Sequence, residues 1–208
     1  MTAIQGSLWD VGSTPGPRRP SSSPERSLLD GDAWVDVHRD WLAGAGTLFD
    51  ELVDAVPWRS TSRVMYDRVV DVPRLESFYG EDDVLPHPAL DDALAALAEQ
   101  YDGEAGGPFR TVGLCLYRHG DDSVAWHGDT IGRGATEDTL VAVLSVGATR
   151  RFLLRPRAGG PSVSFDVAGG DLVVMGGSCQ RTWEHAVPKA RRPVGPRISV
   201  QFRPVGVR

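Results

Sequence analysis

The sequence lacks the features that mark secreted and membrane proteins. It has two cysteines among 208 residues, Cys115 and Cys179, which are too few for a disulfide framework and suit a reducing compartment. No stretch reaches the roughly 18 consecutive apolar residues of a membrane-spanning helix. The N-terminus has no basic segment followed by an apolar run. We therefore expect no signal peptide, no membrane association and a cytoplasmic location.

The chain has more acidic than basic residues, but the two kinds are unevenly distributed. Of its 28 Asp and Glu and 22 Lys and Arg, 3 acidic and 11 basic residues lie between Gly147 and Arg208. The net charge of −6 argues against nucleic acid as a partner, whereas the local excess predicts a basic face in the C-terminal part. Solvated arginines on exposed strands explain the same excess, so charge alone leaves both interpretations open.

The first half of the chain is predicted to be a tail followed by helices. Residues 1–30 are rich in proline and serine, which predicts a poorly ordered tail ahead of one domain over residues 31–208. From Asp32 to Val56, apolar residues recur at steps of three and four, which predicts a helix. A second apolar stripe from Pro88 to Tyr101 predicts another helix. Short strands and turns are expected between the two.

The second half of the chain changes to short β-rich runs separated by glycine and proline. Many short strands with such turns are typical of a sandwich or barrel. We therefore predict an α+β fold in which helices precede a double-sheet jelly roll of the cupin kind. The predicted strands cover residues 111–117, 140–145, 151–155, 162–167, 171–175 and 197–203.

Three residues have the types and spacing of a metal site. His127 and Asp129 lie two positions apart, and such residues point to the same face of an extended segment. His185 is expected on a later strand of the facing sheet. Two histidines and one carboxylate form the facial triad of non-haem Fe(II) oxygenases. The same set suits hydrolytic zinc, and a metal-free β-sandwich is the third interpretation.

The last predicted strand favours iron over zinc. Its residues Arg197, Ser199, Gln201 and Arg203 share one face, while the apolar residues between them share the other. An inward polar face of this kind suits a bound dicarboxylate, because arginine grips a carboxylate through two parallel hydrogen bonds. Iron oxygenases of this class need such a co-substrate, 2-oxoglutarate, and zinc hydrolases do not. A salt-bridged edge strand is the alternative.

Several segments together resemble the AlkB family of Fe(II)/2-oxoglutarate dioxygenases. The resemblance spans roughly residues 58–204. It implies a double-stranded β-helix with N-terminal helices packed on the outside and a nucleotide-recognition lid at about residues 58–80. The segments are residues 143–155, 170–177, 183–189 and 197–203, with Pro73-Arg74 and Tyr79-Gly80 resembling the lid.

The resemblance also implies the roles of individual residues. Iron would be held by His127, Asp129 and His185. Arg197 would bind the distal carboxylate of 2-oxoglutarate, with Arg203 nearby and Tyr117 donating a hydrogen bond. Four positions depart from the family pattern: Cys115 replaces an Asn, Ser199 and Gln201 replace Asn and Thr, and Ile131 replaces an acidic residue that contacts the damaged base.

The reaction implied by the resemblance is oxidative demethylation of N-alkylated bases in nucleic acid. It consumes O2 and 2-oxoglutarate and releases succinate, CO2 and formaldehyde. The expected substrate is single-stranded DNA or RNA, and we expect a monomer with no obligate protein partner. A target base must leave its stack to be reached. The candidate pocket residues are Met65, Tyr66, Tyr79, Trp126 and Ile131.

Two other classes of function remain open. One is the same oxygenase chemistry on a small molecule or a protein side chain, which Ile131 and the acidic N-terminal part favour. The other is a non-catalytic jelly-roll binding module that has lost its metal. The complete triad and both arginines argue against the binding module.

Overall fold

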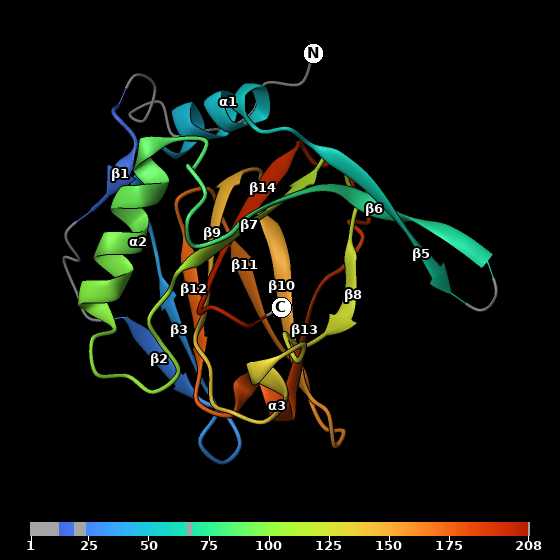
Figure 1. The fold of residues 1–208 in the computed structure, drawn as a ribbon. Helices are drawn as coiled ribbons and strands as arrows, with labels where there is room; N and C mark the ends of the chain where they lie inside the picture. Colours follow the sequence, from blue (N-terminus) through green and yellow to red (C-terminus); the bar gives the residue numbers. More distant parts are fainter. Residues whose placement is uncertain (1–12, 19–23, 66–67, 208) are drawn as a thin grey trace.

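Two antiparallel β-sheets face each other, with two helices on the outside of the larger sheet (Figure 1). A computed structural model describes residues 13–18, 24–65 and 68–207. The larger sheet has the order β2 (Glu25–Leu28), β3 (Trp34–His38), β12 (Leu172–Gly176), β9 (Val141–Gly147), β14 (Arg197–Arg203), β7 (Thr111–Tyr117), β6 (Arg68–Tyr79) and β5 (Arg59–Met65). The smaller has the order β11 (Val163–Val167), β10 (Arg150–Pro156), β13 (Trp183–Val187) and β8 (Val124–His127).

The remaining elements are short or lie outside the two sheets. They are the strands β1 (Gly16–Pro17) and β4 (Leu42–Ala43), which pair with each other, and the helices α1 (Ala45–Ala55), α2 (Pro88–Gln100), α3 (Cys179–Thr182) and η1 (Arg133–Ala135). Within the described ranges, no helix combines the length and the apolar character needed to cross a membrane. The arrangement is the predicted double-stranded β-helix.

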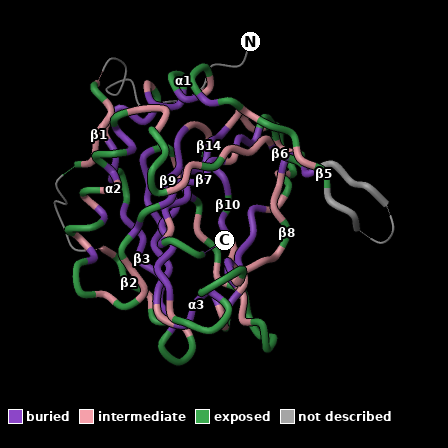
Figure 2. The backbone as a smooth tube through the Cα atoms, viewed as in Figure 1, coloured by how far each residue is buried: buried purple, intermediate pink, exposed green. Residues whose placement is uncertain are grey.

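The hydrophobic core has two parts, one on each face of the larger sheet. Figure 2 shows the buried segments running through the middle of the molecule. One part packs α1 and α2 against the sheet and includes Ile198, Val200 and Phe202 of β14. The other lies between the two sheets and includes Phe152 and Leu154 of β10. Successive side chains of a strand point to opposite faces of the sheet. Because Ile198, Val200 and Phe202 pack under the helices, the polar residues of β14 between them face the space between the two sheets.

The predicted helix from Asp32 to Val56 is wrong over its first half. This region forms β3 and β4, and helix α1 begins only at Ala45. Every residue of β3 is buried: Trp34 packs under the helices, whereas Val35 and Val37 face the space between the sheets. A strand buried on both faces has no polar alternation, so its apolar run resembles that of a helix.

Part of the predicted N-terminal tail forms the two short strands β1 and β2. β2 pairs with β3 at the edge of the larger sheet. Its Arg26 donates two hydrogen bonds, of 2.7 and 2.8 Å, to the buried carboxylate of Asp36, and its guanidinium lies 3.8 Å above the Trp34 ring. These contacts compensate for burying a charge and hold β2 in place. Residues 1–12 and 19–23 of the predicted tail lie outside the described residues.

Strands β5 and β6 form a hairpin that projects beyond the rest of the fold (Figure 1). The base of the hairpin joins the larger sheet, because β6 pairs with β7 from Leu75 to Tyr79. Alternate residues of β6 therefore face opposite ways: Leu75 and Tyr79 pack under the helices, and Arg74 faces the space between the sheets. The expected strands are confirmed, but they are not short: β5 and β6 have 7 and 12 residues and form one hairpin.

Candidate active site

His127, Asp129 and His185 come together between the two sheets. Each offers a ligand atom, and these atoms lie within 4.8 Å of one another. His127 is the last residue of β8, and it lies directly opposite His185 in the neighbouring strand β13. The two histidines therefore come from adjacent strands of one sheet. The expectation that His185 lies on the facing sheet is wrong, because β8 is the edge strand that pairs with β13.

Neighbouring groups fix the orientation of each candidate ligand. The Nδ1 of His127 lies 2.9 Å from the carbonyl oxygen of Ala125, which can only accept, so Nδ1 carries the proton and Nε2 is free for a metal. The main-chain N–H of Asp129 donates to Oε1 of the buried Gln180 at 3.0 Å. The ring of His185 stacks on Phe152, with centroids 5.5 Å apart.

Arg203 grips the carboxylate of Asp129. Its Nε donates to Oδ2 at 3.0 Å and its Nη2 to Oδ1 at 3.3 Å. The resemblance to AlkB places Arg203 near 2-oxoglutarate. Arg203 does line the cavity, but its two hydrogen bonds go to the Asp129 carboxylate. A partner of this kind orients a ligating carboxylate.

The protonation states of the three groups suit metal binding. Burial raises the pKa of Asp129, but the charge and hydrogen bonds of Arg203, together with the two histidines in their protonated form, hold it at about 2. Burial lowers the pKa of His185 to about 3 and also lowers the pKa of His127. At neutral pH the site therefore presents one carboxylate and two neutral imidazoles, which are the forms that bind a metal cation.

A cavity lies beside the three residues. It brings together all six residues expected to bind the co-substrate, together with both histidines, and adds apolar walls and a third arginine. Its lining consists of Arg74, Cys115, Tyr117, Val124, His127, Val143, Phe152, His185, Val187, Arg197, Ser199, Gln201 and Arg203.

Arg197 is a buried cation that has no counterion among the described residues. It is 1% exposed, its Nε donates to Ser145 Oγ at 2.7 Å, and its Nη1 is buried with no hydrogen-bond partner in the described ranges. Burial lowers its pKa, and within the described part of the chain no carboxylate acts to offset the change. A buried unpaired charge is strongly unfavourable, so this guanidinium fits an anionic ligand.

Tyr117 lies beside Arg197 and stays neutral. Its ring centre is 5.3 Å from the guanidinium carbon, and burial raises the pKa of its hydroxyl to about 12. A neutral phenol keeps its proton and can donate a hydrogen bond to a carboxylate. The donor set of Arg197 and Tyr117 therefore fits 2-oxoglutarate, and the triad beside it fits Fe(II).

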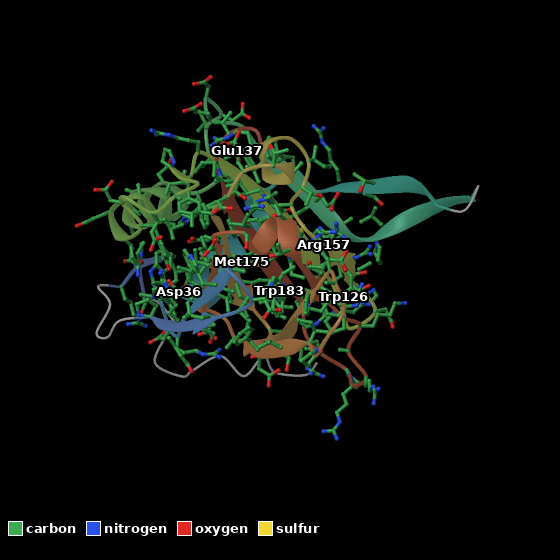
Figure 3. The ribbon with its side chains drawn as sticks, turned by 90° about the horizontal axis from the view of Figure 1, so that it is seen from below. Asp36, Trp126, Glu137, Arg157, Met175 and Trp183 are labelled. Carbon is green, nitrogen blue, oxygen red and sulfur yellow. The ribbon has the colours of Figure 1, made fainter. Side chains whose placement is uncertain are left out.

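Of the predicted base-contacting residues, the three whose side chains the structure describes, Tyr79, Trp126 and Ile131, do not line this cavity. Trp126 lies toward the periphery of the molecule in Figure 3, with the Arg155 guanidinium 4.3 Å above its ring. Tyr79 packs against the core under the helices, and Ile131 is 70% exposed. The Met65 side chain and Tyr66 lie outside the described residues.

Besides the valines that line the cavity, four residues of the site were not predicted as such: Arg74, Ser145, Phe152 and Gln180. Ser145 could have been predicted from the sequence, because it is a lone hydroxyl in an otherwise apolar strand. In the structure it lies opposite Ser199 of β14. Gln180 had none, since its contact depends on how α3 meets the loop after β8. Arg74 belongs to the lid-like segment, but no pattern in that segment shows that its side chain turns into the cavity.

One glycine limits how the Asp129 loop can be built. A Cβ added to Gly134 in η1 would overlap the main-chain oxygen of Asp129. We expect Gly134→Ala to displace this loop and to weaken metal binding by about tenfold or more, as changes behind a metal ligand do. Metal titration of the purified protein checks this. Gly46→Ala in α1 is the control, since nothing lies within 4 Å of its added Cβ; equal affinities in both variants would refute the prediction.

Comparison with known proteins gives the family. The 2OG-Fe(II) oxygenase superfamily matches residues 43–203. The bovine "Alpha-ketoglutarate-dependent dioxygenase alkB homolog 3" is 33% identical over 183 residues, which are 79% of this chain and 63% of the bovine protein. The "DNA oxidative demethylase ALKBH2" of Arabidopsis thaliana is 27% identical over 229 residues, covering 88% of this chain and 70% of the plant protein. This chain thus spans less than two thirds of the bovine relative.

A solved structure shows the same fold. A prolyl hydroxylase of Trichoplax adhaerens, in complex with a hypoxia inducible factor peptide fragment, superposes with a TM-score of 0.56 and 11% identity, over 81% of this chain and 82% of the other. At that identity the likeness concerns the fold alone. Because the superfamily matches more than half of the sequence, the chain belongs to the 2OG-Fe(II) oxygenase superfamily, and it is similar in sequence to alkB homologues within it.

Proposed function

We propose that the protein is an Fe(II)/2-oxoglutarate-dependent dioxygenase that demethylates N-alkylated bases in nucleic acid. The observation that carries this proposal is the position of the His127, Asp129 and His185 group directly beside a cavity that contains the unpaired Arg197. When bound, iron and 2-oxoglutarate supply an O2-dependent oxidation that yields succinate and CO2. Oxidation of an N-methyl group releases it as formaldehyde.

Each residue of the site has a separate task in this proposal. His127 Nε2, the Asp129 carboxylate and His185 hold the metal, and Gln180 and Arg203 keep Asp129 in place. Arg197 and Tyr117 bind a carboxylate of the co-substrate. The apolar side chains of the cavity exclude water from this region, which strengthens the charged hydrogen bonds within it.

Nucleic acid is the proposed substrate class for three reasons. Both curated relatives are AlkB homologues, and the name of the plant protein gives DNA demethylation as its activity. The C-terminal part of this chain carries an excess of arginine. The hairpin of β5 and β6 projects beside the strands that line the cavity, where a lid would lie. Single strands are preferred in this proposal because no base pair has to be opened.

Turnover with different substrates tests the proposal. The protein is incubated with iron, ascorbate and 2-oxoglutarate, and succinate is measured with methylated and unmethylated oligonucleotides. We expect stimulation by a methylated single strand and loss of the methyl mass. The exposed Ile131 favours the alternative of a small-molecule or protein substrate. Succinate release that responds to a peptide or metabolite pool, and to no oligonucleotide, would establish that alternative.

Salt dependence gives a second prediction. If basic side chains contact phosphates, the affinity for a single-stranded oligonucleotide should fall by roughly tenfold between 50 and 200 mM salt for about three contacts. Fluorescence anisotropy with a labelled oligonucleotide measures this. An uncharged strand analogue of the same sequence is the control and should show little salt response. An affinity that does not depend on salt would contradict phosphate contacts.

A further inference from the structure

Arg74 has no task in the proposed site, although it lines the cavity. It comes from β6 and is 9% exposed. Its Nη2 lies 2.6 Å from Glu76 Oε1, and its Nη1 donates to the carbonyl oxygen of Ser123 at 3.3 Å. Its Nε is buried and has no hydrogen-bond partner among the described residues. An unsatisfied buried donor is unfavourable, so this N–H marks a place for an acceptor.

The adjacent strand position lacks a strong donor. Cys115 of β7 lies opposite Glu76 of β6 on one side and Ser199 of β14 on the other. Its Sγ is 3.8 Å from Gln201 Oε1. Burial raises the pKa of the thiol, and the charge of Arg74 and its contact with Sγ oppose that shift. A neutral thiol is a weak donor. The resemblance to AlkB places an Asn here, whose amide would donate into the cavity.

Two buried guanidinium donors that lack partners in the described part of the chain therefore belong to residues lining one cavity. Arg197 Nη1 comes from β14 and Arg74 Nε from β6, with β7 between them in the sheet. The third arginine of the cavity, Arg203, is occupied by Asp129. A dicarboxylate offers several acceptor oxygens, and arginine binds carboxylates through more than one N–H.

We propose that Arg74 binds 2-oxoglutarate, and that its Nε–H replaces the donor that Cys115 cannot supply. The identity of the anion rests on the proposed function. The position of Arg74 adds a consequence, because β6 belongs to the projecting hairpin. Co-substrate binding would then involve the hairpin that occupies the lid position in the proposed function. The affinities for 2-oxoglutarate and for nucleic acid would therefore be coupled through β6.

Binding without turnover tests this proposal. Calorimetry measures the affinity of 2-oxoglutarate for protein loaded with Mn(II) in the absence of oxygen. We expect Arg74→Gln to weaken binding by about tenfold to a hundredfold, the usual effect of losing a hydrogen bond to a charged group. Arg110→Gln is the matched control, since it removes an exposed guanidinium that lies 3.6 Å from Glu81. It is expected to bind like the wild-type protein.

A rescue variant separates binding from a purely structural role. Adding Cys115→Asn to Arg74→Gln restores an amide donor on the neighbouring strand, and we expect it to recover about tenfold in affinity. A defect in the packing of β6 would not be repaired by this change. If Arg74→Gln does not fold, Arg74→Lys serves instead, because it keeps the charge beside Glu76 but has no Nε–H donor; the same loss is expected.

The outcomes distinguish this proposal from the proposed function. If the wild-type protein binds no 2-oxoglutarate, the proposed function fails. If the wild-type protein binds it and Arg74→Gln binds it equally well, only the role of Arg74 is overturned. Oligonucleotide affinity is measured for the same variants. A loss of oligonucleotide binding with unchanged co-substrate affinity would assign Arg74 to the nucleic acid and would also overturn the proposal.

Discussion

Replacing any one of His127, Asp129 and His185 with alanine is expected to abolish turnover and to reduce metal binding below detection in a routine titration. Among the described residues, these three form the group whose ligand atoms lie close enough together to hold one ion. The neighbouring acidic candidates are occupied elsewhere, since Glu137 pairs with Arg133 and Asp138 with Arg181. No described acidic side chain is therefore placed to substitute for a lost ligand.

The three variants should differ in their stability without metal. Asp129→Ala removes the partner of Arg203, a largely buried guanidinium, and is expected to destabilise the fold by about 3–5 kcal/mol. His127→Ala removes a neutral imidazole and leaves no charge unpaired. Metal content and circular dichroism of each variant check these expectations. His119→Ala is the control, because that side chain is 56% exposed in a turn; full metal occupancy in any triad variant would remove that residue from the site.

Local alternation was sufficient to predict the strands that form the floor of the cavity. In β14, polar and apolar side chains alternate from Arg197 to Arg203, and the structure separates them into the cavity and the core. The observed bounds of β7 and β14 agree with those expected. The pattern is informative here because one face of each strand meets apolar residues and the other meets polar ones.

Contacts between distant strands could not be predicted in the same way. The ion pair of Asp129 with Arg203 joins residues 74 positions apart. The turn of Arg74 into the cavity depends on the register of β6 against β7. Sequence patterns give the faces of single strands but not the pairing between them. The strand β3 was missed for a related reason, because burial on both faces removes the alternation on which the prediction depends.

Arg197→Ala is expected to weaken 2-oxoglutarate binding by roughly a hundredfold or more. Removing one partner of a buried charge pair costs about 2–5 kcal/mol, and each 1.4 kcal/mol corresponds to a factor of ten. The co-substrate carboxylate would lose both the charge and the free Nη1 donor, while Ser145 would lose its hydrogen-bond partner. Arg197→Lys keeps the charge but loses the planar guanidinium with its several N–H donors. Its affinity for 2-oxoglutarate should therefore lie between those of the alanine variant and the wild-type protein.

The same substitution should leave the ligand-free protein as stable as before, or more stable. Arg197 is buried without a carboxylate partner in the described part of the chain, so its removal relieves an uncompensated charge. Calorimetry with the Mn(II)-loaded protein gives the affinity, and denaturant unfolding without ligand gives the stability. Arg203→Ala is the contrasting variant: because it releases Asp129, its main effect should fall on metal binding. An unchanged 2-oxoglutarate affinity in Arg197→Ala would show that the co-substrate lies elsewhere. A loss of stability comparable to that of Asp129→Ala would show that Arg197 has a structural partner.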